Sequence, residues 1–128
     1  MSYYFAKTMA VPFEEAVERV KAELKNEGFG VLTEVDVRKT LHEKLGVDFR
    51  PYRILGACNA PYAYRALQAE DKIGTMLPCS VIVQELGPDR VELAAIDPLA
   101  SMAAVKNEDL GAIGLEVRAK LQAVISRL

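Results

Sequence analysis

The sequence has 128 residues, of which 51% are hydrophobic and 27% are charged, and its formal net charge is −2. These values are typical of one globular domain and exclude an intrinsically disordered chain. The near balance of 16 basic and 18 acidic residues excludes a strongly basic surface of the kind that binds nucleic acid. No apolar run is long enough for a membrane helix, and residues 1–12 lack the features of a secretory signal. We therefore expect a single domain over residues 1–128, located in the cytoplasm, with neither nucleic acid nor a membrane as partner.

The hydrophobic pattern predicts five strands and four helices. Runs of aromatic and β-branched residues predict the strands, and apolar residues spaced three and four apart predict the helices. Prolines, glycines and capping side chains mark where these elements begin and end. In chain order the predicted elements begin with a strand over 3–11, a helix over 13–27 and a strand over 29–35. A short helix capped by Asp36, a strand over 50–58 and a helix capped by Asn59 follow. After a loop over 72–78 come strands over 80–86 and 91–96 and a helix over 108–128 that Asn107 caps.

The order of these elements, β-α-β-α-β-α-β-β-α, predicts the fold class. Residues 87–90 join the last two strands and are typical of an antiparallel hairpin, which argues against a purely parallel sheet. We predict an α+β fold with one mixed sheet of about five strands and helices packed on it. The first and last helices are expected to supply most of the helical core, through Val17, Val20, Ile113, Val117 and Leu121.

The sequence contains no catalytic motif that we can identify. It has neither a nucleotide-binding glycine loop nor a nucleophile elbow. The single histidine, His42, follows Leu41 on the second helix and is expected to point into water. Arg53 lies inside an otherwise apolar strand, so we expect it at the sheet edge or in an ion pair with an acid such as Asp97. Whether the protein is an enzyme stays open at this point.

The two cysteines are the most informative residues. Cys58 ends the third predicted strand directly before a helix start, where the helix dipole favours a thiolate, and Cys79 opens the fourth strand. If these strands are antiparallel neighbours, the two thiols approach each other; if they are parallel, the thiols lie at opposite ends of the sheet. A pair of single cysteines does not supply a structural zinc site. Both could also pack as small hydrophobic residues, and the cytoplasm disfavours a stable disulfide.

Four segments of the chain resemble signatures of one known family. They are 28–36 (GFGVLTEVD), 49–59 (FRPYRILGACN), 77–79 (LPC) and 95–98 (AIDP). In this order they resemble the domain-of-unknown-function family numbered 302, and the resemblance covers nearly the whole chain. It implies a compact α+β domain but no activity. Cys58, Asn59, Cys79 and Asp97 belong to these motifs, and we take them as candidate ligand-binding residues.

Three functions are consistent with the sequence. The favoured one is a binding module that holds a soft ligand between Cys58 and Cys79, such as Cu(I), haem iron or a sulfur-containing small molecule. The second is a thiol-based redox or sulfur-transfer protein with Cys58 as nucleophile. The third is a non-catalytic homodimeric interaction domain. Its expected contact surfaces are the aromatic start of the chain, 3–5, and the last helix with its internal glycines, Gly111 and Gly114. The sequence alone names no cofactor.

Overall fold

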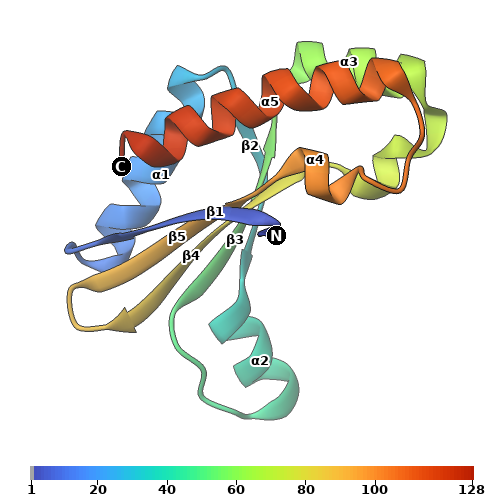
Figure 1. Cartoon of the computed structure of the whole chain (residues 1–128). Helices are drawn as coiled ribbons and strands as arrows, with labels where there is room; N and C mark the ends of the chain where they lie inside the picture. The colour runs from blue at the N-terminus through green and yellow to red at the C-terminus, as the bar shows by residue number, and fades with distance from the viewer. Residues whose placement is uncertain (1) are drawn as a thin grey trace.

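Five strands form one sheet in the order β1-β5-β4-β3-β2 in the computed structural model, which describes residues 2–128 (Figure 1). The strands are β1 (Tyr4–Met9), β2 (Gly30–Asp36), β3 (Tyr52–Cys58), β4 (Cys79–Gly87) and β5 (Arg90–Ile96). The helices are α1 (Phe13–Asn26), α2 (Val37–Leu45), α3 (Ala60–Ala69), α4 (Pro98–Ser101) and α5 (Glu108–Ser126), and a 3-10 helix, η1, covers Asp71–Met76. The predicted α+β fold with five strands is confirmed.

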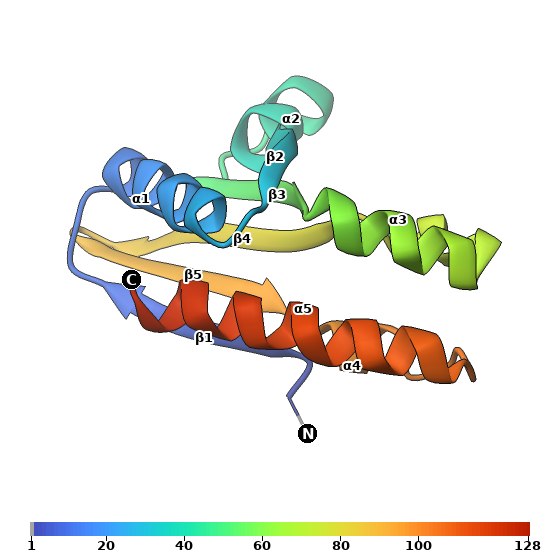
Figure 2. The same cartoon turned by 90° about the horizontal axis from the view of Figure 1, so that it is seen from above.

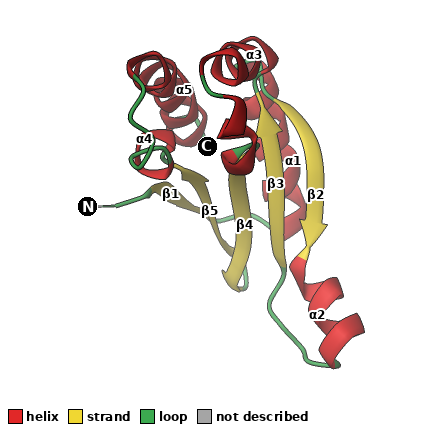
Figure 3. Cartoon of the chain, turned by 90° about the vertical axis from the view of Figure 1, so that its right-hand side faces the viewer, coloured by secondary structure: helices red, strands yellow, loops and turns green. Residues whose placement is uncertain are grey.

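The sheet is antiparallel between all neighbouring strands of the described chain, and not mixed as the sequence led us to expect. Helices between strands usually carry the chain across a sheet and make the strands parallel. Here only α1 carries the chain across the sheet, because it links β1 at one edge to β2 at the opposite edge. The helices α2 and α3 stand at opposite ends of the sheet and return the chain to a neighbouring strand, as Figure 3 shows.

The helices α1 and α5 lie side by side over one face of the sheet (Figure 2). The residues predicted for the helical core are all buried, and Val17, Val20 and Leu121 have no exposed surface. They meet alternate residues of the central strands, such as Val81 and Leu93, which are also fully buried. Each such aliphatic side chain contributes about 1.5–3 kcal/mol when it is removed from water. This face of the sheet is therefore the main core.

Within residues 2–128, no helix covers the centre of the opposite face of the sheet (Figure 1). This opposite face presents the residues that alternate with the core, including Tyr4, Ser80, Ile82 and Gln84. Tyr4 is 43% exposed, whereas the half-buried Ile82 lies in the floor of a shallow groove. The apolar part of this open face is a surface that a partner could cover.

An ion-pair cluster around Arg53 fixes α1 to the sheet. The guanidinium of Arg53 contacts Glu14 at 2.7 Å and Glu34 at 2.9 Å, so its partners are these acids and not Asp97. Glu34 also contacts Lys21 at 2.7 Å, and the hydrogen bond from Lys21 lowers the pKa of this carboxyl group. These contacts join α1 to β2 and β3. The expected structural role of Arg53 is thus confirmed, with partners different from the acid that we named.

Two short elements were not predicted. The loop expected over 72–78 contains η1, whose Ile73 is 1% exposed and packs into the core. A single helical turn, α4, follows Asp97, whose side chain accepts a hydrogen bond from the backbone N–H of Leu99 at 3.0 Å.

Between residues 2 and 128, no helix has both the length and the apolar character needed to cross a membrane.

Candidate functional site

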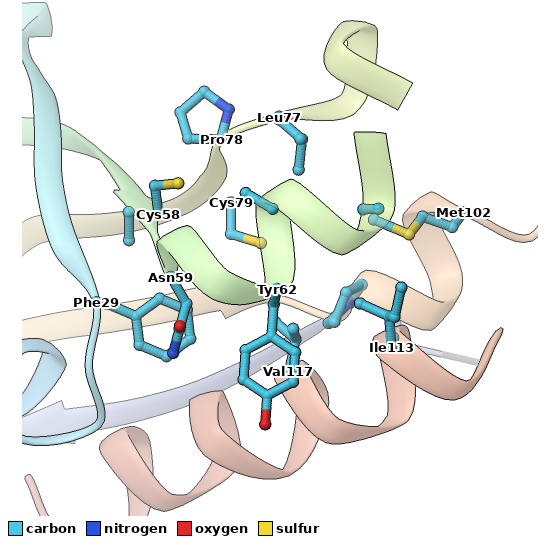
Figure 4. A pocket seen from close by; sticks show the side chains of 15 residues that line it. Phe29, Cys58, Asn59, Tyr62, Leu77, Pro78, Cys79, Met102, Ile113 and Val117 are labelled. Carbon is cyan, nitrogen blue, oxygen red and sulfur yellow. The ribbon is translucent and has the colours of Figure 1, made fainter. Parts of the chain in front are cut away.

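A small cavity lies where α3 and α5 extend past the end of the sheet (Figure 4). Its volume is about 30 Å³, and nearly all of its lining is apolar. The end of β3, the start of β4, α3, α5 and the segment after α4 all contribute side chains. A water molecule occupies about 30 Å³ in the liquid, so the cavity accommodates one ion or one very small molecule. It is far smaller than a site for haem or for a drug-sized ligand.

Both cysteines line this cavity. Ala57 of β3 lies directly opposite Cys79 of β4 in an antiparallel pair, so Cys58 is one residue from Cys79 across the strands. The strands β3 and β4 are therefore antiparallel neighbours, which is the arrangement for which the sequence predicts that the two thiols approach each other. Cys79 is 9% exposed, and Cys58 is half-buried at the strand end. The structure thus places one thiol inside and the other nearer the surface.

The two sulfur atoms occupy different sides of the strand ends. Successive side chains of a strand point to opposite faces, so Cys79 shares the core face with Ala57, and Cys58 leaves on the other side. In Figure 4 the Cys58 sulfur lies on the Pro78 side, whereas the Cys79 sulfur points into the cavity. Both thiols are free. A disulfide requires the two Cβ vectors to point towards each other, so this arrangement disfavours one.

The environment of Cys79 keeps its thiol protonated. Burial, reinforced by the negative charge of the Cys58 thiolate, raises the pKa of Cys79 from 9.0 to about 11. A thiol with this pKa is a poor nucleophile at neutral pH, because the thiolate is the reactive form. Cys79 is therefore unsuited to be an attacking group, and a metal ion that binds it must displace the thiol proton.

Asn59 does not cap α3, contrary to the prediction. Its amide nitrogen instead donates to the carbonyl oxygen of Glu27 at 3.1 Å, at the C-terminal end of α1. Gly28 makes this possible, since it adopts the left-handed conformation with φ of 85° and has no side chain that would crowd the Asn59 amide. Asn59 is 9% exposed and lines the cavity, but its amide hydrogen bond holds the α1–β2 corner.

Asp97 lies outside the cavity lining and stabilises α4. Besides the N–H of Leu99, it accepts a hydrogen bond from Arg118 of α5 at 3.2 Å. The neighbouring residue, Pro98, lines the cavity. Asp97 therefore positions one wall of the cavity, and the candidate ligands that the structure brings together are Cys58 and Cys79.

Sequence reasoning did not identify Tyr62 and Met102 as cavity residues. Tyr62 lies in the first part of α3, and its ring faces the cavity beside Val117 (Figure 4). Met102 directly follows α4, and its thioether lines the far end of the cavity from Cys58. No motif marks either residue. The one available signal for Met102 was the proline after Asp97, which favours a new helical turn that changes the direction of the chain.

The rest of the described chain offers no richer metal site. Within residues 2–128 no group of three or more histidine, cysteine, aspartate or glutamate side chains converges on one point. His42, the single histidine, is exposed on α2 in a surface depression with Asp36 and Asp48, as the prediction that it points into water requires. The sulfur-bearing residues of the cavity lining are Cys58, Cys79 and Met102.

Comparison with known proteins identifies the family. The family model of a domain of unknown function, DUF302, matches residues 5–128. The chain belongs to the DUF302 family. The fold of this DUF302 protein is similar to the crystal structure of an uncharacterized conserved DUF302 protein from Bacillus stearothermophilus, with a TM-score of 0.91 and 29% identity over 99% of this chain and 98% of that chain. No curated protein matches the sequence. The resemblance seen in the sequence is thereby confirmed.

Proposed function

We propose that this DUF302 protein binds one soft metal ion, represented by Cu(I), with the thiolates of Cys58 and Cys79. The observation that carries the proposal is that three sulfur-bearing residues, Cys58, Cys79 and Met102, line one apolar cavity of about 30 Å³. Thiolate and thioether ligands select soft ions. Structural zinc takes four ligands, which this cavity lacks. The size of the cavity favours a single ion over haem or a sulfur-containing small molecule.

A thiol-based redox or sulfur-transfer function has less support. The raised pKa of Cys79 disfavours it as a nucleophile, and the one histidine lies on α2, so it supplies no base to Cys58. The opposed directions of the two sulfur atoms also disfavour a reversible disulfide. We place the metal-binding function in the cytoplasm, where reducing conditions keep both thiols free.

A titration with Cu(I), in competition with the chelator bicinchoninate and under a non-thiol reductant, tests this function. We expect the parent protein to bind one ion per chain. Loss of a residue that only hydrogen-bonds to a metal ligand weakens metal binding by up to about 100-fold. The Cys58→Ser, Cys79→Ala double variant removes the ligands themselves, so its affinity for Cu(I) should fall by more than this.

Methionine variants provide the matched control for that titration. Met102→Leu should weaken binding, whereas Met76→Leu should not, because Met76 packs on the core outside the cavity lining. Circular dichroism establishes that each variant is folded. Parent-like binding by the folded double variant would contradict the proposal.

We also propose that the protein is a homodimer that forms through the open face of the sheet. Of the two internal glycines of α5, one packs within the chain and the other faces open space. Gly111 has no atom within 4 Å of the position of an added Cβ, and Gly114 is approached by Leu99 of the same chain. The aromatic start of the chain remains available, since Tyr3 is 64% and Tyr4 43% exposed beside the groove of the open face.

Sedimentation at micromolar concentration tests this assembly. We expect a mass twice that of one chain for the parent, and dissociation in Tyr4→Ala because the substitution removes apolar contact area. Tyr64→Ala is the matched control, since Tyr64 is 66% exposed but lies on α3, away from the open face. A monomeric parent, or equal dissociation of both variants, would contradict a dimer through this face.

A further inference from the structure

The two cysteines differ in how a metal ion can reach them. Cys79 is 9% exposed and points into the cavity, whereas Cys58 is half-buried at its rim beside Pro78 (Figure 4). The cavity has room for about one water molecule. An ion that still carries its own ligands therefore does not fit next to Cys79. It must lose them at the rim, where Cys58 is the sulfur that a carrier can reach.

We propose that Cys58 is the capturing ligand, which takes Cu(I) from a low-molecular-weight thiol carrier and passes it inward to Cys79. This inference rests on the proposed metal-binding function and adds an order of events and a class of donor. The half-buried position of Cys58 beside Pro78 suits a small thiol better than a folded protein as donor. A thiol is also the ligand class that holds soft ions in a reducing cytoplasm.

The exchange balances without an oxidant or a reductant. In the first step the Cys58 sulfur forms a bond to Cu(I), one carrier thiolate leaves, and the Cys58 thiol proton goes to that thiolate. In the second step the Cys79 sulfur forms a bond to the same ion, the second carrier thiolate leaves, and it takes the Cys79 proton. The copper remains Cu(I), and two free carrier thiols are released for each ion bound.

The second step requires the Cys58 sulfur to move towards Cys79. The Cys58 and Cys79 sulfurs lie on different sides of neighbouring strand ends, with Ala57 directly opposite Cys79. Because the Cβ atoms of Cys58 and Cys79 point to opposite sides, the Cys58 sulfur reaches Cys79 only if the end of β3 shifts together with this side chain. Loop segments move in nanoseconds to microseconds, so this movement does not limit transfer. The capture step is therefore expected to determine the rate.

Time-resolved transfer from the Cu(I)–glutathione complex, followed by thiolate-to-copper absorbance, tests the order of events. The same variants are also measured at equilibrium against bicinchoninate. We expect Cys58→Ser to lose the fast capture phase. Cys79→Ala should keep this phase and lose equilibrium affinity, because the ion stays at the rim with one carrier thiol still bound. Met76→Leu serves as the parent-like control, and circular dichroism verifies the fold of each variant.

The two assays separate the failure of this inference from failure of the proposed function. A fast phase that persists in Cys58→Ser, or that Cys79→Ala loses to the same extent, would overturn the capture role while leaving equilibrium binding intact. A parent protein that binds no Cu(I) in competition with bicinchoninate would overturn both. Loss of the fast phase in Cys58→Ser alone, together with tight equilibrium binding by the parent, supports the order from Cys58 to Cys79.

Discussion

Replacing Gly56 by alanine is expected to destabilise the protein by about 3 kcal/mol, the upper end of the usual cost of overpacking. A Cβ at this position would overlap the Thr33 hydroxyl oxygen and would lie 2.8 Å from Cγ of Pro78. Gly56 pairs with Thr33 of β2 on one side and with Ser80 of β4 on the other, so the strand has no free direction in which to move. Urea denaturation measures the loss as a lower midpoint.

Two further variants define the cause of that loss. Thr33→Ala in the Gly56→Ala background should recover part of the stability but not all of it, because the rigid ring of Pro78 remains. Gly111→Ala is the matched control. Gly111 is exposed within α5 and has no neighbour to crowd, so alanine should stabilise the protein by up to about 1 kcal/mol. An unchanged midpoint in Gly56→Ala would show that the neighbouring strands yield more easily than the structure indicates.

The second large effect is a loss of stability at alkaline pH that depends on Cys79. Its pKa is raised in the folded protein, from 9.0 to about 11, chiefly by burial and further by the charge of Cys58. Between these two values the folded state keeps a proton that the unfolded state has released. The free energy of unfolding therefore falls as pH rises through this window, by about 3 kcal/mol in total, and the contribution is fully present below pH 9.

Urea denaturation of the parent and of Cys79→Ala at several pH values from 8 to about 11 measures this contribution. Lysine and tyrosine side chains also titrate in that range. The pKa of Lys21 is raised mainly by its hydrogen bond to Glu34, so the deprotonation of Lys21 also lowers the free energy of unfolding as the pH rises. Because these groups are common to both proteins, the difference between the two curves isolates Cys79. Parallel curves would show that the Cys79 thiol is not kept from water.

The long helices could be predicted because their signals are local. Asn107 caps α5 as predicted, since its side chain accepts from the N–H of Asp109 and of Leu110. Likewise Asp36 accepts from the N–H of Lys39 at the start of α2. Whether Cys58 and Cys79 approach each other depended on the relative direction of two strands. The sequence predicts approach for antiparallel neighbours and separation for parallel ones, but it does not decide between them.

What the sequence did not reveal depends on which distant segments meet. Arg53 had several acids available, and only the packing of α1 beside β2 brings Glu14 and Glu34 to it. Asn59 has the side chain of a helix cap, but the carbonyl of Glu27 is a competing partner from an element far away in sequence. Met102 reaches the cavity only because α4 redirects the chain. Such partners follow from tertiary packing, which overrides local preference.

The strand order β1-β5-β4-β3-β2 has a consequence for how the molecule folds. Strands β2 to β5 pair with their neighbours in sequence, so each of these pairings closes a short or moderate loop. The pairing of β1 with β5 joins Tyr4 to Ile96, which lie far apart in sequence, and has the largest closure entropy. High contact order of this kind slows folding. Until β1 docks, β5 has a free edge with unpaired N–H and C=O groups, and such an edge exposes a nascent chain to aggregation.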